Sequence, residues 1–157
     1  MKMTYTLQTL STELQELQLP TFDYEIAWRL GSLMQAQAAG GALPAAITVT
    51  HGEDVVLSLL MPGATLDNSA WAARKRAVAH RFHRSSLAIR LEAEAGSFDF
   101  NKRYRLSDTD YVASGGGVPI ILRAGTLIGT IGVSDLPDVE DHRLAASTLR
   151  KHLAAEP

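Results

Sequence analysis

Two pairs of short apolar runs, each joined by a tight polar turn, constrain the fold of this chain more than any other feature. The runs pair as residues 45–50 with 55–61 and residues 118–122 with 127–133. Aliphatic and β-branched residues around a short glycine-containing turn are typical of β-hairpins. A single hairpin cannot bury its faces, so the two hairpins are predicted to pair edge to edge into a four-stranded antiparallel sheet.

Helical periodicity accounts for most of the remaining chain and gives the order ααββα(α)ββα. Near the N-terminus, Leu7, Leu10, Leu14 and Leu17 recur at spacings of three and four. This spacing places them on one narrow stripe of a helix within residues 1–19. Two heptads are too short for an independent coiled coil, so the stripe must pack on its own domain or on a neighbouring subunit.

Capping and stop residues mark the ends of other predicted helices. Asp23 is a suitable N-cap for a second helix, which the glycines at 40–41 end. Residues 86–95 alternate in part like a strand, but their Glu and Ala content and the stop at Gly96 favour a helix. Residues 139–153 form an amphipathic helix at the end of the chain.

The central helix is predicted to begin near Asp67 or Ser69 and to end near Arg84. Three large apolar residues share a narrow arc of it: Trp71, Val78 and Phe82. We expect this arc to face the core. After it, residues 107–110 resemble a capping box and predict a short helical turn.

These elements predict an α/β (α+β) fold with an antiparallel sheet of four to five strands covered by helices. Helices are expected on one face of the sheet, which leaves the other face wet or shared. A short sheet with one weakly protected face favours oligomerisation. The leucine stripe is one candidate for the subunit contact.

Composition narrows the function classes. The 157 residues are suited to one domain, and the chain contains no cysteine, which excludes disulfides, thiolate metal sites and a thiol nucleophile. A net charge of −2 gives no general attraction to nucleic acid or anionic membranes. Polar residues interrupt every apolar run near the N-terminus, so no signal peptide or membrane span is expected and a cytoplasmic location is predicted.

The densest group of chemically active residues lies on the central helix. Arg76, His80 and His83 fall within about 60° of one another on a helical wheel, opposite the apolar arc. Guanidinium groups bind carboxylate or phosphate, and a neutral imidazole can bind a metal or heme iron. A solvated helix face is the alternative. No carboxylate accompanies the histidines, so no metal site is predicted.

Three consecutive glycines precede the third strand. Gly115, Gly116 and Gly117 could expose successive backbone N–H groups that bind an anion, or simply form a tight loop. The segment does not match a phosphate-binding loop.

No catalytic motif can be assigned. Gly-x-Ser-x-Gly and His-Glu-x-x-His are both absent, and no Ser, His and Asp are grouped by spacing. The acids and histidine at residues 138–142 begin the last helix, where acids stabilise the helix dipole. Binding is therefore favoured over catalysis, while enzymatic activity stays open.

Several segments resemble a known family. The most specific are Arg74-Lys75-Arg76, Phe82-His83-Arg84-Ser85-Ser86 and Gly115-Gly116-Gly117-Val118-Pro119-Ile120, in that order. Residues 22–31, 61–68, 128–134 and 140–142 add to the likeness. Together they resemble uncharacterised protein family (UPF) 0303, a branch of the HbpS/GlcG-like "heme-degrading domain" superfamily. The likeness runs from about residue 20 to the C-terminus.

This resemblance implies a profilin-like fold, a single HbpS/GlcG-like domain over residues 1–157 and assembly into homo-oligomers. Heme is then a candidate cofactor, although a fold does not itself transfer function. The first hypothesis is an oligomeric protein that binds heme or another small anion through Arg76, His80, His83 and Gly115–Gly117. Walls for a heme ring would come from Phe82, Trp71 or Tyr111. The alternatives are a structural or adaptor homo-oligomer, and an enzyme on a small carboxylated metabolite.

Overall fold

The computed structural model describes residues 4–155. Its elements are α1 (Leu7–Glu16), α2 (Tyr24–Gly40), β1 (Ala46–His51), β2 (Asp54–Leu60), α3 (Leu66–Phe82), α4 (Ser86–Ala95), α5 (Phe100–Tyr104), β3 (Gly117–Ile121), β4 (Leu127–Ser134) and α6 (Asp138–Ala155). The four predicted strands are confirmed, and each of their ends agrees with the structure within one residue. The two tight turns between them are confirmed as well. The predicted mixed α/β class is also confirmed.

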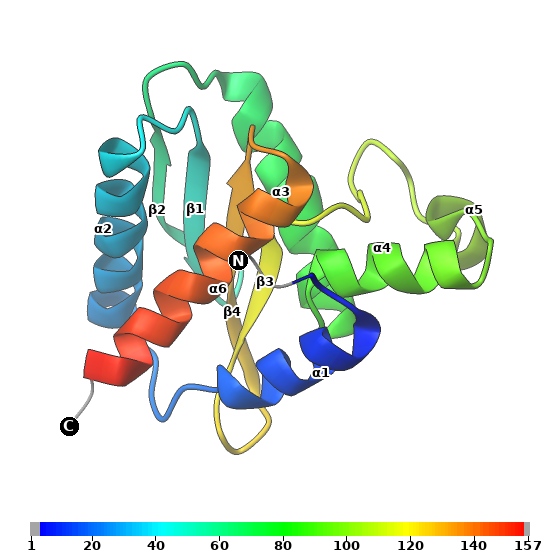
Figure 1. The fold of residues 1–157 in the computed structure, drawn as a ribbon, viewed down its shortest axis with the longest axis horizontal. Helices are drawn as coiled ribbons and strands as arrows, with labels where there is room; N and C mark the ends of the chain where they lie inside the picture. Colours follow the sequence, from blue (N-terminus) through cyan, green and yellow to red (C-terminus); the bar gives the residue numbers. More distant parts are fainter. Residues whose placement is uncertain (1–3, 156–157) are drawn as a thin grey trace.

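The two hairpins pair as the sequence indicates. They form one four-stranded antiparallel sheet in the order β2-β1-β4-β3, so β1 and β4 join the hairpins at the centre (Figure 1). The central pair runs from Ala46 opposite Ser134 to His51 opposite Gly129. Gly52 adopts a positive φ of 59° in the β1–β2 turn, a conformation that costs glycine little.

One face of the sheet is apolar. Ile47 and Val49 of β1 and Ile131 and Val133 of β4 are fully buried in the main core. They pack against α2 and α6, whose buried residues belong to the same cluster. This face contributes most of the hydrophobic stabilisation because it removes the largest apolar side chains from water.

The other face is made of small and hydroxyl residues, and α3 crosses it. Thr50 and Thr130 lie on this face, and so does Gly132. The expectation that one face stays wet or shared is therefore wrong, since helices cover both faces (Figure 1). Small side chains allow a helix that itself buries few large residues to lie close to the strands.

Two glycines set the distance between α3 and the sheet. A Cβ atom added to Gly132 would lie 2.5 Å from Cγ of Arg76 and 2.9 Å from the backbone oxygen of Ala72. A Cβ added to Gly117 would collide with the backbone oxygen of Lys75. The strands therefore contact the α3 backbone directly at Ala72–Arg76.

The leucine stripe packs within its own chain. Leu10 and Leu17 are buried, and Leu10 clusters with Leu87 and Ala88 of α4. Hydrogen bonds of Leu19 with Ile121 and Arg123 then tie the segment after α1 to the β3 side of the sheet. Of the two alternatives, packing on its own domain and contact with a neighbouring subunit, the structure shows the first. Most of the stripe is therefore unavailable to a neighbouring subunit.

The predictions for the central helix and the following arm are only partly correct. A capping box between Thr65 and Asn68 begins α3, earlier than the predicted caps. Val78 is buried, but Trp71 is 41% exposed, because the aromatic cluster formed with α4 and α5 covers only the later turns of α3. The short helical turn predicted at residues 107–110 is confirmed, since the Tyr111 N–H donates to the Ser107 carbonyl at 3.0 Å. The helix α5, capped by Asp99, was not predicted.

Substituting Gly132→Ala tests the close approach of α3. We expect the added methyl group to lower the free energy of unfolding by roughly 1–3 kcal/mol, since the Ala72 carbonyl is backbone and cannot move aside cheaply. Gly40→Ala is the matched control, because a Cβ there meets nothing within 4 Å. Urea denaturation of both variants measures the effect. Equal stability of the two would contradict the proposed packing.

Candidate functional site

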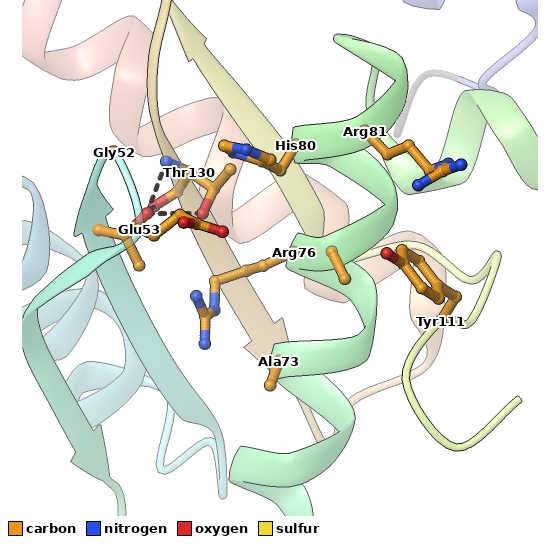
Figure 2. A pocket seen from close by; sticks show the side chains of 10 residues that line it. Gly52, Glu53, Ala73, Arg76, His80, Arg81, Tyr111 and Thr130 are labelled. Carbon is orange, nitrogen blue, oxygen red and sulfur yellow. Dashed lines mark hydrogen bonds between the residues drawn. The ribbon is translucent and has the colours of Figure 1, made fainter. Parts of the chain in front are cut away.

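A pocket lies beside α3, extending from the β1–β2 turn across the helix to the loop that contains Tyr111 (Figure 2). Its volume is about 300 Å³. Its lining combines cations, hydroxyls and small apolar groups: Thr50, Gly52, Glu53, Ala73, Arg76, Ala77, His80, Arg81, Tyr111 and Thr130. Such a mixture of an apolar wall with a few polar groups is typical of small-ligand sites.

Arg76 is the most distinctive group in the pocket. Its Nε atom is buried and has no hydrogen-bond partner among the described residues. Burial lowers the pKa of its guanidinium, because desolvation disfavours the charged form. Its stem packs on Gly132, which fixes the side chain between α3 and the strands. The residue as a whole is half-buried and lines the pocket, so its guanidinium is suited to an anion that would supply the missing partner.

Two threonine hydroxyls stand on the sheet side of the pocket. The Oγ1 atoms of Thr50 and Thr130 are 2.8 Å apart, and the Thr130 N–H donates to Thr50 Oγ1 at 3.0 Å. Each hydroxyl has one proton, and only one of the two is used between them. Thr50 Oγ1 also donates to the Thr130 carbonyl at 3.5 Å, so the Thr130 hydroxyl donates to Thr50 Oγ1 and both hydroxyl protons have acceptors within the protein. The pair therefore forms a polar, internally hydrogen-bonded wall on this side of the pocket.

Ionisable groups surround the opening. His80 is exposed and points from α3 toward the strands, near Thr130 (Figure 2). Arg81 and Tyr111 lie on the other side of the helix, with the guanidinium carbon 5.8 Å from the ring centre. Glu53 on the β1–β2 turn is the one carboxylate among the residues that line the pocket. Cations therefore outnumber acids around it.

The structure brings together two of the residues that the sequence singled out. Arg76 and His80 line the same pocket. His83 is exposed at the C-cap of α3 in a left-handed conformation, and it does not line the pocket. The helical wheel placed His83 beside Arg76 and His80 on the assumption that the helix continues to Arg84. Because α3 ends at Phe82, the side chain of His83 does not follow the helical periodicity.

The three glycines serve packing within the protein. The Gly115 N–H donates to Asp138 Oδ2 at 3.0 Å, and the Gly117 N–H donates to Ser86 Oγ at 2.8 Å. All three residues are buried, and Gly116 has a φ of 133°. The donors of Gly115 and Gly117 are occupied by the chain's own side chains, and none of the three glycines lines the pocket at Arg76.

Lys75, the neighbour of Arg76, has the opposite environment. Its Nζ lies 2.9 Å from Asp141 Oδ2 and 3.3 Å from the Val133 carbonyl, and both charged side chains are buried. Burial raises the pKa of Asp141 to about 7, although the charge of Lys75 acts in the other direction. The pair joins α3 to the first turn of α6. The acids at 138–142 therefore do more than stabilise a helix dipole.

A second buried pair involves His142, whose Nε2 lies 2.6 Å from Glu13 Oε1 of α1. The edge of Tyr5 contacts the same imidazole, with ring centres 4.8 Å apart. The side chain of His142 therefore joins α6 to α1. Within residues 4–155, no group of three or more His, Asp or Glu side chains is arranged to hold a metal ion.

Sequence reasoning missed the sheet side of the pocket. Thr48 and Thr50 alternate with Ile47 and Val49 in β1, which signals a polar strand face. Nothing in that alternation shows that Thr130, eighty residues later, pairs with Thr50.

In the part of the chain that the structure describes, no helix has the length and apolar character to cross a membrane.

Comparisons with known proteins agree with this fold. The family described as "Haem degrading protein HbpS-like" matches residues 22–150. A UPF0303 protein of Serratia proteamaculans is 40% identical over 147 residues, which are 94% of this chain and 91% of that protein. The chain therefore belongs to the HbpS-like family, within its UPF0303 proteins.

Two solved structures are similar as well. The crystal structure of the Ybr137w protein has a TM-score of 0.88 at 25% identity, covering 97% of this chain and 90% of the other. A crystal structure of a PduOC:heme complex has a TM-score of 0.69 at 19% identity, covering 83% and 94% respectively. At this identity the likeness to the second structure shows a shared fold.

The buried Lys75–Asp141 pair predicts a pH dependence of stability. The native Asp141 carboxyl keeps its proton up to a pKa of about 7, whereas the unfolded chain loses it near 3.8. The native state binds more protons in that interval, so the free energy of unfolding should fall as pH rises from about 4 to about 7.

Denaturation at several pH values measures this slope. Asp141→Asn should remove much of it, while Asp108→Asn, an exposed control, should retain it. A slope that persists unchanged in Asp141→Asn would show that another group is responsible.

Proposed function

We propose that this protein binds a small anionic ligand in the pocket beside α3, with Arg76 as the principal anchor. The supporting observation is the buried Arg76 Nε without a hydrogen-bond partner among the described residues. No hydrogen bond or ion pair joins the half-buried Arg76 guanidinium to another described residue, and the side chain lines the pocket. A guanidinium held at a pocket without a partner among the described residues supports an anion from solution as its partner.

Heme is the first ligand to test. Its propionates are carboxylates, which match the planar guanidinium of Arg76. His80, exposed beside Arg76, is the residue that would reach an iron. When bound, heme would supply ligand-binding and redox chemistry at its iron. His83 and the glycine loop are not part of this proposal, because they lie outside the pocket.

Arg76→Met is the central test. The variant should lose heme-induced Soret absorption at stoichiometric heme, because the propionate loses its partner. The unfolding free energy should stay the same or rise by about 1 kcal/mol, since an uncompensated buried charge is removed. Arg74→Met is the control: Arg74 is on the same helix but donates to the Thr109 carbonyl outside the pocket. Equal heme binding by Arg76→Met, Arg74→Met and wild type would refute the assignment.

A second function is that of a structural homo-oligomer, and the edge of the sheet favours it. β2 pairs only with β1 among the described strands, and its Val55 and Leu60 are 56% and 46% exposed. Tyr24 and Trp28 on α2 are exposed as well. The β3 edge, in contrast, is short and contains Pro119, and Leu19 forms a bridge to Leu122 beside it. Unprotected apolar edge strands favour strand pairing with another copy.

Light scattering tests this interface. Val55→Lys combined with Leu60→Lys should reduce the solution mass of the particle, because lysine on an edge strand opposes pairing. Leu7→Lys on α1 serves as the control, since Leu7 is also partly exposed but lies away from β2. If the mass falls only in the control, the interface involves α1 instead.

A cytoplasmic location and the absence of nucleic-acid binding stay predictions of the sequence.

A further inference from the structure

The shape of the pocket limits the ligand more narrowly than its charge. A volume of about 300 Å³ is near the lower limit for small-molecule sites and equals the share of roughly ten water molecules. A tetrapyrrole ring is much larger than this space. If heme binds, a propionate enters and the ring stays outside, so the pocket itself fits a compact molecule.

Cations stand at both ends of the pocket. Arg76 lies toward the strands and Arg81 lies on the opposite side of α3 (Figure 2). Residues five apart on a helix differ by about 7.5 Å in rise, which separates the two side chains along the axis as well. The ring of Tyr111 holds the second guanidinium near the pocket through a cation–π contact of 5.8 Å.

The stretch between these cations is apolar and shallow. Ala73 and Ala77 present only methyl groups there, and both line the pocket. A methylene chain could lie over them without leaving a polar group unsatisfied. The guanidinium groups of Arg76 and Arg81 outnumber the carboxylate of Glu53 in the lining, so its net charge favours an anion.

On this basis we propose that the pocket binds a short aliphatic dicarboxylate, with one carboxylate at Arg76 and the other at Arg81. The methyl groups of Ala73 and Ala77, which line the pocket, contact the methylene chain. This inference rests on the proposed function, since it names the ligand class of the same site.

Calorimetric titration with a chain-length series tests the proposal. The probes are malonate, succinate, glutarate and adipate, with pentanoate as the monocarboxylate of the same carbon number as glutarate. One member of the series should bind about tenfold more tightly than pentanoate, the effect of one charge-assisted pair. Sebacate, which exceeds the pocket, should bind more weakly than that member. Inorganic phosphate, which has no second end, should resemble pentanoate.

Two variants separate the ends of the ligand. Arg81→Gln should weaken the best dicarboxylate to the level of pentanoate and leave pentanoate binding unchanged. Arg76→Gln should weaken both ligands. Arg74→Gln, which alters a cation outside the pocket, should change neither. Thermal melts of each variant confirm that it is folded.

The possible failures are distinct. Equal binding of pentanoate and every dicarboxylate, with loss of both in Arg76→Gln, would overturn the dicarboxylate proposal and leave the anion site standing. The same conclusion follows if heme binds through Arg76 but no dicarboxylate displaces it. If neither heme, phosphate nor any carboxylate binds in a manner that depends on Arg76, the proposed function itself fails.

Discussion

The direct contact between α3 and the glycines of the sheet is the constraint on which the rest of this structure depends. Gly132 leaves space for the stem of Arg76 and for the Ala72 carbonyl, and Gly117 does the same for the Lys75 carbonyl. Side chains at these positions would force the helix away from the strands. The helix would then no longer hold its two adjacent cations at fixed positions between the layers, and both the pocket and the link to α6 would be lost.

Lys75 and Arg76 are neighbours in sequence, yet the fold uses them in opposite ways. Lys75 is satisfied within the protein by Asp141 and the Val133 carbonyl. Arg76 is held by packing alone, and its Nε has no hydrogen-bond partner in the described chain. The first arrangement joins α3 to α6, and the second leaves a donor without a partner among the described residues. The proposed anion site rests on this contrast.

Membership of the HbpS-like family establishes the fold and a group of relatives, while the site must define the ligand. The PduOC:heme complex shows a similar fold at 19% identity, which leaves the ligand of this chain to be judged on its own pocket. That pocket has a guanidinium at each end, hydroxyls on one wall and methyl groups between. The proposals of heme and of a smaller acid as ligands both rest on this lining.

The sequence by itself determined the two hairpins, the N-cap of α2 at Asp23, the helical state of residues 86–95 and the cationic character of α3, because each depends on contacts within a few residues. The helical wheel of α3 singled out Arg76 and His80 as candidate ligand-binding residues, and both line the pocket. Tertiary structure decided that His83 leaves the site, that the donors of Gly115 and Gly117 are already used, and that Thr50 meets Thr130. It also buried Lys75 against Asp141. These outcomes depend on which distant segments pack together, and periodicity along one segment carries no information about its partner.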